Sequence, residues 1–218
     1  MITHLVPICF LGGSGGNFLC TWIAQADDSS TPLTEFSKHG NAHLYKNKNK
    51  PEKYLFNMFS DQDVAIENLK LYDSELTKRT FSECHLINDT QILENFDTCI
   101  KIYFDADDMP DIAYSFIGKH CIDAVGGDEN DIVALTKQFR DRLQVMTDRF
   151  QGFTKPLPLQ EGVLSVSWKE LVHLDEVALI NKLSAFLSID STKFDTAALL
   201  KWREITIAGI ASLKALIA

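Results

Sequence analysis

The sequence predicts an α/β fold in which a mostly parallel sheet is flanked by helices. An apolar segment runs through a group of glycines near residue 12 directly into an apolar helix, and short strand-like segments then alternate with longer amphipathic ones. Alternation of this kind is typical of βαβ units around a parallel sheet. We expect one domain over residues 1–218, with residues 193–218 forming a C-terminal helix.

Composition limits the environment and the partners of the chain. Apolar residues make up 45% of the 218 residues, which is enough for a sizeable core. The chain contains 21 Lys and Arg residues and 30 Asp and Glu residues, which gives a net charge of −9. This balance opposes nonspecific attraction to nucleic acid or to anionic lipid. The apolar start lacks the basic flank of a signal peptide, and no stretch approaches the roughly 20 apolar residues of a membrane span. We expect a cytoplasmic protein without nucleic-acid or membrane partners.

The cysteines favour a reduced protein without a zinc site. They are odd in number, widely spaced and free of any CxxC pair, which argues against a disulfide framework and against zinc ligation. Buried thiols are the expected state of the five: Cys9, Cys20, Cys84, Cys99 and Cys121.

The first half of the chain contains two clear elements and one weak one. A buried strand is predicted over Leu5–Leu11, in which Pro7 should lie near the strand start or on a sheet edge because it lacks an N–H. A helix follows over Asn17–Ala26. Residues 28–53 are polar and weakly patterned, as in a surface loop, and Cys84–Asn88 predicts a short second strand.

A third strand and its helix follow in the middle of the chain. Apolar residues recur at period two within Cys99–Asp105, which is the best strand signal in the sequence. Asp107 or Asp108 can cap the next helix, and Pro110 suits its first turn.

The second half of the chain is mostly helical. Steps of three and four between apolar residues define a long amphipathic helix over Asp131–Phe150. A strand is expected over Val163–Trp168, a core-facing helix over Val177–Leu187, and a last helix over Leu199–Leu216.

The glycine-rich segment predicts an anion site. Glycines permit a tight turn and a close approach of backbone N–H groups to a phosphate or sulfate, and the following helix adds the positive end of its dipole. The alternative is a simple strand-to-helix turn, in which Ser14 or Asn17 caps the helix instead of contacting an anion. This segment contains no lysine, which phosphate-binding loops usually carry. The candidate binding residues are Gly12, Gly13, Ser14, Gly15, Gly16, Asn17 and Phe18.

Read in order, these segments resemble the sulfotransferase family. The family's opening motif, close to Pro-Lys-Ser-Gly-Thr-Thr-Trp, partly matches residues 12–18, and a family strand and helix match Lys101–Ser115 without a gap. The segment Glu83–Ile87 stands where the family has its catalytic histidine, and Val163–Leu171 resembles a further family segment. The resemblance covers roughly residues 4–190 in the family's order.

The resemblance implies a P-loop-type three-layer α/β fold and transfer of a sulfuryl group from the donor PAPS to a hydroxyl or amine of a small-molecule or sugar acceptor, without a metal. In this scheme Gly13–Asn17 hold the donor's 5′-phosphosulfate, and Ser115, one helical turn after Asp111, reaches its 3′-phosphate. His85 is the general base that activates the acceptor. From its own surroundings, a hydrogen-bonded core role for His85 is as well supported.

Three positive charges that the family carries are absent here. The family's loop lysine, the lysine before its histidine and its 3′-phosphate arginine are matched by Gly13, Glu83 and Asp107. A carboxylate about 4 Å from a phosphate is repelled by about 4 kcal/mol at an effective dielectric of 20. Ordinary PAPS binding would therefore need another basic residue, from Lys46–Lys50 or Arg140, in the site.

Two alternatives therefore stand beside sulfuryl transfer. One is a noncatalytic binding or assembly protein that lost the donor site, whose C-terminal helix packs on a partner or on a second copy in a homodimer, although a helix that covers its own sheet is the commoner arrangement. The other is an ATP-dependent phosphoryl transferase. Its loop requires Gly-Lys-Ser/Thr, which Gly16-Asn17-Phe18 does not supply.

Overall fold

The computed structural model describes residues 1–30, 62–85, 93–120, 130–134 and 161–217, together with residues 137, 154 and 156. Within these residues, four parallel strands form one sheet in the order β2-β1-β3-β4. The predicted α/β class with a parallel sheet is confirmed. The strands are β1 (Leu5–Phe10), β2 (Thr80–His85), β3 (Cys99–Tyr103) and β4 (Val163–Ser167).

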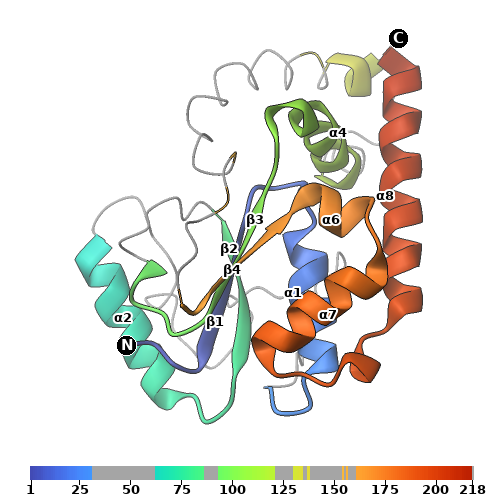
Figure 1. The fold of residues 1–218 in the computed structure, drawn as a ribbon. Coiled ribbons are helices and arrows are strands. Elements are labelled where there is room, and N and C mark those ends of the chain that lie inside the picture. Colours follow the sequence, from blue (N-terminus) through green and yellow to red (C-terminus); the bar gives the residue numbers. More distant parts are fainter. Residues whose placement is uncertain are drawn as a thin grey trace.

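Helices lie on both faces of the sheet, as Figure 1 shows. On one face lie α1 (Gly16–Ala26), α6 (Trp168–Val172), α7 (Glu176–Leu187) and α8 (Thr196–Ile217), and on the other lies α2 (Gln62–Glu75). A further helix, α4 (Met109–His120), follows β3 and packs against α8.

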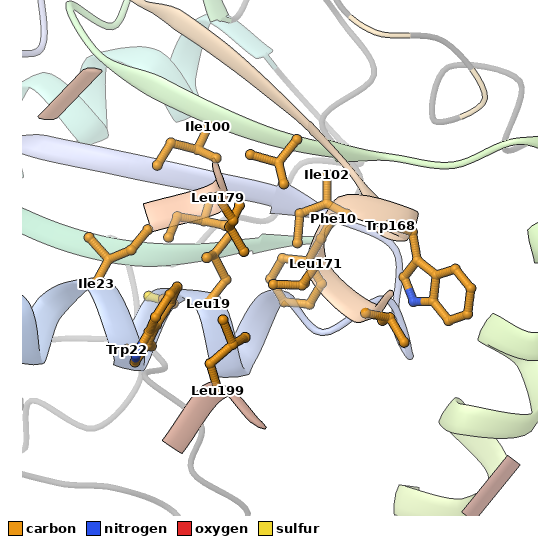
Figure 2. Packing of buried hydrophobic residues seen from close by; sticks show 14 of the residues in the cluster. Phe10, Leu19, Trp22, Ile23, Ile100, Ile102, Trp168, Leu171, Leu179 and Leu199 are labelled. Carbon is orange, nitrogen blue, oxygen red and sulfur yellow. The ribbon is translucent and has the colours of Figure 1, made fainter. Parts of the chain in front are cut away.

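Strand β1 supplies side chains to two separate cores. Val6, Ile8 and Phe10 belong to a large cluster with α1, α6, α7 and α8, whereas Leu5 and Cys9 belong to a smaller one beneath α2. This division follows from the alternation of side chains along a strand. Figure 2 shows Phe10 within the larger core, between α1 and α6.

Pro7 lies on a central strand and not on an edge, because β1 is flanked by both β2 and β3. The register with β3 starts only at Ile8, which pairs with Ile100. Pro7 therefore lies just before that ladder begins, where the N–H that it lacks is not required.

The second strand begins earlier than the sequence predicts. β2 starts at Thr80 and ends at His85, whereas the prediction covered Cys84–Asn88, of which residues 86–88 lie outside the described residues. Its whole length pairs with β1, from Leu5 opposite Thr80 to Phe10 opposite His85. The polar residues in Thr80–His85 concealed the strand, since pairing with β1 outweighs their weak apolar pattern.

The turn after β3 contains a short capped helix that the sequence did not predict. Asp105 is the N-cap of a short 3₁₀ helix, η3 (Ala106–Asp108), and Asp108 closes a capping box with it. The N–H of Asp105 donates to the carboxylate of Asp108 at 2.9 Å. Asp107 is exposed, Asp108 directly precedes α4, and Pro110 lies in the first turn of α4 as predicted.

The second half matches the predictions where it is described. β4, α7 and α8 are present, and α6 adds a short helix whose N-cap Ser167 forms a capping box with Glu170. Of the long helix predicted over Asp131–Phe150, residues 131–134 and 137 are helical and the others lie outside the described residues, as does most of the segment 28–53. In the part of the chain that is described, no helix is long and apolar enough to cross a membrane.

Candidate functional site

The glycine turn follows β1, the strand from which the order of the sheet is built outward in both directions. From β1 the chain continues to β2 on one side, and β3 then lies on the other side of β1. In parallel α/β sheets, ligands bind outside the carboxyl ends of the strands at such a switch point. The turn from Leu11 to Gly15 and the segment that follows β3 meet at this edge, so the predicted position of the site agrees with the topology.

The turn has two positions that only glycine occupies without strain. Gly13 and Gly15 have φ angles of 89° and 86°, and Gly15 is the N-cap of α1, where no side chain caps the helix. Ser14 is fully buried, and both its N–H and its hydroxyl donate to the carbonyl of Leu11, at 3.0 and 2.6 Å. The Ser14 hydroxyl thus closes the turn and does not cap α1.

Neighbouring side chains pack directly on the glycines. A Cβ added to Gly12 or Gly13 would lie 2.9 Å from Phe116 of α4, and at Gly13 it would also lie 2.3 Å from the carbonyl of Ile112. At Gly15 it would meet the ring of Trp202 from α8 at 2.7 Å. Spacings below 3.0 Å leave no room for a side chain, so these glycines permit α4 and α8 to approach the turn.

An aromatic stack continues this contact along α1. Phe18 stacks on Trp202, with ring centroids 4.6 Å apart and an interplanar angle of 10°, and it also lies 5.8 Å from Trp22. The ring of Phe10 fills the space that a Cβ on Gly16 would enter, at 1.9 Å. Phe18, a predicted binding residue, is therefore half-buried and its ring packs on α8.

Two indole N–H groups near the turn lack an acceptor. Among the described residues, the buried Nε1 atoms of Trp168 and Trp202 have no hydrogen-bond partner. The Trp202 ring edge that touches Gly15 adjoins its Nε1, and Trp168 lies one turn before Leu171, whose methyl group is 3.0 Å from the added Cβ at Gly15. Figure 2 shows Trp168 and Leu171 close to Phe10. An indole N–H is a donor only, so each group could donate a hydrogen bond to an oxygen atom of a ligand.

Basic side chains on the surrounding elements are paired within the protein. Lys169 of α6 bonds Asp105 at 2.8 Å and lies 3.5 Å from Asp108, and these carboxylates raise the pKa of Lys169. Lys214 of α8 bonds Asp111 at 2.5 Å.

Arg203, which is buried on α8, joins that helix to the end of α6. It donates to the backbone carbonyls of Leu171 and Glu170 at 2.8 and 3.0 Å, and it lies 3.6 Å from Glu176. Burial lowers the pKa of Arg203, and Glu176 partly offsets this. Its guanidinium is therefore occupied in holding α8 in place over the turn.

The other predicted site residues lie on neighbouring elements. The backbone of His85 ends β2 in register with Phe10, which brings it to the same edge of the sheet as the turn. Ser115 is half-buried on α4, directly before Phe116. Asp111, one turn earlier, is bound to Lys214. The backbone therefore brings the turn, His85 and Ser115 to one end of the sheet.

Lys101 is the one matched residue of the family segment with an unexpected environment. It is buried in β3 opposite Cys9, where burial lowers its pKa and the nearby Cys9 and Cys99 thiols oppose this. Strand geometry places Lys101 about 10 Å below the turn, since Cys9 precedes Gly12 by three residues at about 3.3 Å each. Lys101 therefore does not replace the missing loop lysine.

Sequence reasoning missed the aromatic groups at the turn. The sequence does not single out Phe116, Trp168 or Trp202 as site residues, and no local pattern indicates that a tryptophan from the last helix returns to a glycine turn near residue 15. No group of three His, Cys, Asp or Glu that could hold a metal occurs within the described residues. Cys9, Cys20 and Cys99 are buried and reduced, as predicted.

No family model, curated protein or solved structure matches the chain. The resemblance to sulfotransferases therefore rests on the residues and their order alone.

Proposed function

We propose that this chain is a noncatalytic binding or assembly protein that retains a sulfotransferase-like α/β fold. The proposal rests on the packing of Phe116 and Trp202 on the glycines of the β1–α1 turn. A Cβ added to these glycines would lie less than 3 Å from the Phe116 or Trp202 side chain. The protein's own helices α4 and α8 pack directly on the turn to which the resemblance assigns the sulfuryl donor.

The charges around the turn support the same proposal. Sulfuryl transfer requires cations that stabilise the charge developing on the departing phosphosulfate oxygen. Here Lys169, Arg203 and Lys214 are bonded to carboxylates or backbone carbonyls, and their release would leave those groups without a partner. Asp107 adds an exposed negative charge where the resemblance implies an arginine.

Thermal melting with candidate ligands tests the proposal. We expect the same melting temperature in buffer, with adenosine 3′,5′-bisphosphate and with ATP·Mg²⁺, because neither nucleotide finds a donor site. A ligand present at 100 times its dissociation constant would stabilise the fold by about 2.7 kcal/mol, which is readily detected. A shift with ATP·Mg²⁺ alone would instead support a phosphoryl transferase.

Sulfuryl transfer from a PAPS-like donor is the second candidate, and two observations favour it. The turn lies at the switch point of the sheet with no side-chain cap on α1, and the indole N–H groups of Trp168 and Trp202 lack an acceptor. Together these groups form a donor-rich region at a helix N-terminus. In this scheme Gly13–Asn17 bind the 5′-phosphosulfate, Ser115 contacts the 3′-phosphate and His85 is the base.

A melting shift with the bisphosphate would overturn the first proposal in favour of the second. His85→Ala should then abolish sulfuryl transfer while leaving that shift unchanged, because a general base acts on the acceptor and not on the donor. Unchanged turnover in His85→Ala would exclude His85 from this role.

A further inference from the structure

Helix α8 carries an exposed stripe beside the one that it buries. Leu199, Arg203, Thr206, Ile210 and Leu213 face the core, and the residue after each of them faces outward. The outward residues follow one another at steps of four, three, four and three, so they share one line along the helix. We call them the α8 stripe: Leu200, Glu204, Ile207, Ala211 and Lys214.

The α8 stripe exposes three apolar side chains on one line of the helix. Leu200 is 47% exposed and Ile207 is 42% exposed, and Ala211 is exposed as well. Charge occurs only at Glu204, between Leu200 and Ile207, and at Lys214, after Ala211. In Figure 1, α8 runs along one border of the molecule, with its length parallel to that border.

We propose that the α8 stripe docks against the α8 stripe of a second copy, with the two helices antiparallel about a two-fold axis level with Gly209. In this register Ile207 faces Ala211 of the other copy, which places a large side chain against a small one. Glu204 faces Lys214 of the other copy. Two-fold symmetry repeats both pairs, which gives a self-complementary interface.

The charges fit this antiparallel register better than a parallel pair in register. In an antiparallel pair centred at residue 209, each Glu204 carboxylate meets a Lys214 ammonium, whereas a parallel pair in register would oppose like charges. Lys214 already bonds Asp111, and its ammonium has three donor hydrogens, so it can bond a second carboxylate. The steps of four and three are those by which coiled-coil helices pack.

Sedimentation of two matched variants tests the interface. Ile207→Lys changes the stripe, and Ile205→Lys changes an isoleucine that is 61% exposed on the same helix but about 160° around it. We expect the wild type and Ile205→Lys to approach about twice the 24.5-kDa chain mass with rising concentration. Ile207→Lys should weaken the dimer at least tenfold, with unchanged circular dichroism. A wild type that stays monomeric, or an effect of Ile205→Lys in place of Ile207→Lys, overturns the proposal.

A mixing experiment tests the charge register independently. Glu204→Lys alone and Lys214→Glu alone each oppose like charges twice and should be monomeric. A mixture of the two variants opposes unlike charges at both places and should form a heterodimer. If the mixture sediments as monomers, the antiparallel register is wrong. Because no nucleotide takes part, this result does not depend on the ligand-melting experiment.

Discussion

Single buried polar residues anchor segments that are far apart in the sequence. The carboxylate of Asp73, near the end of α2, accepts hydrogen bonds from the N–H groups of Thr3, His4 and Leu5 at 2.9, 2.8 and 2.7 Å. Burial by itself raises the pKa of Asp73, but the three N–H donors outweigh it and hold the pKa below the ordinary value of 3.8. The start of β1 is thereby fixed by a residue about 70 positions later in the chain.

Asp73→Asn should lower the free energy of unfolding by about 1–3 kcal/mol at neutral pH, because a neutral amide replaces a charged acceptor. A carboxylate with a lowered folded-state pKa stabilises the protein above its unfolded value and loses this effect as pH falls through the folded value. The difference between wild type and variant should therefore shrink below pH 3.8. Urea unfolding as a function of pH measures it.

Asp28→Asn is the control for this prediction. Asp28 pairs with Lys193 at the surface, with its side chain 76% exposed, and should contribute less than about 1 kcal/mol. Equal losses from both variants at neutral pH would show that the Asp73 hydrogen bonds carry no special stability.

At the scale of elements, the β1–α1 turn and α8 depend on each other. Gly15, the N-cap of α1, has a left-handed φ, and its lack of a side chain lets the Trp202 ring lie against its backbone. Arg203, the next residue, bonds the last carbonyls of α6. The end of α6, the turn and α8 therefore form one packed unit over the carboxyl ends of the strands.

Gly15→Ala should destabilise the protein by at least about 2 kcal/mol, since a left-handed alanine costs about 1–2 kcal/mol and the clash with Trp202 adds to it. Gly209→Ala is the matched control, because a Cβ there meets nothing within 4 Å and alanine favours a helix by up to about 1 kcal/mol. Urea unfolding compares them. A Gly15→Ala variant that is as stable as Gly209→Ala, or more stable, would contradict the packing of Trp202 on the turn.

A double-mutant cycle isolates this contact. In Trp202→Ala the added Cβ of Gly15→Ala no longer meets the ring, so the two losses should be less than additive. Additive losses would mean that Gly15 is needed for its φ angle alone.

At the scale of the whole molecule, α8 closes the larger core. Leu199, Ile210 and Leu213 of α8 join the cluster that contains Phe10, Trp22 and the faces of α1 and α7. Figure 2 shows Leu199 beside Leu19 and Trp22 of α1. The last helix therefore packs with one stripe on the helices α1, α4 and α6 of its own chain, while its neighbouring stripe faces outward.

Adjacent leucines of α8 separate the two roles of the helix. Leu199 is fully buried, so Leu199→Ala should cost about 2–5 kcal/mol of unfolding free energy. Leu200 is 47% exposed, and Leu200→Ala should change it by less than about 0.5 kcal/mol. Both are measured by urea unfolding at low protein concentration, where self-association does not contribute. A large loss from Leu200→Ala under these conditions would place that residue in the core.

Local sequence predicts the alternation of strands and helices, the glycine turn, the start of α4, and the limits of β1, α1, β4 and α7 to within a few residues. These features depend on local rules: side chains alternate along strands, apolar residues recur every three or four positions in helices, and glycine tolerates a positive φ. The turn's location at the edge of a parallel sheet follows from the same alternation.

What lies against the turn depends on contacts between segments that are far apart in the sequence. Trp202 is 187 residues from Gly15, and no local pattern determines that the two meet. The burial of Lys101, the anchoring of β1 by Asp73 and the occupation of Lys169, Arg203 and Lys214 by partners are likewise contacts between distant segments. Local sequence fixes dihedral preferences and periodicity, whereas the contents of a site depend on which distant side chains fill the same space when the core packs.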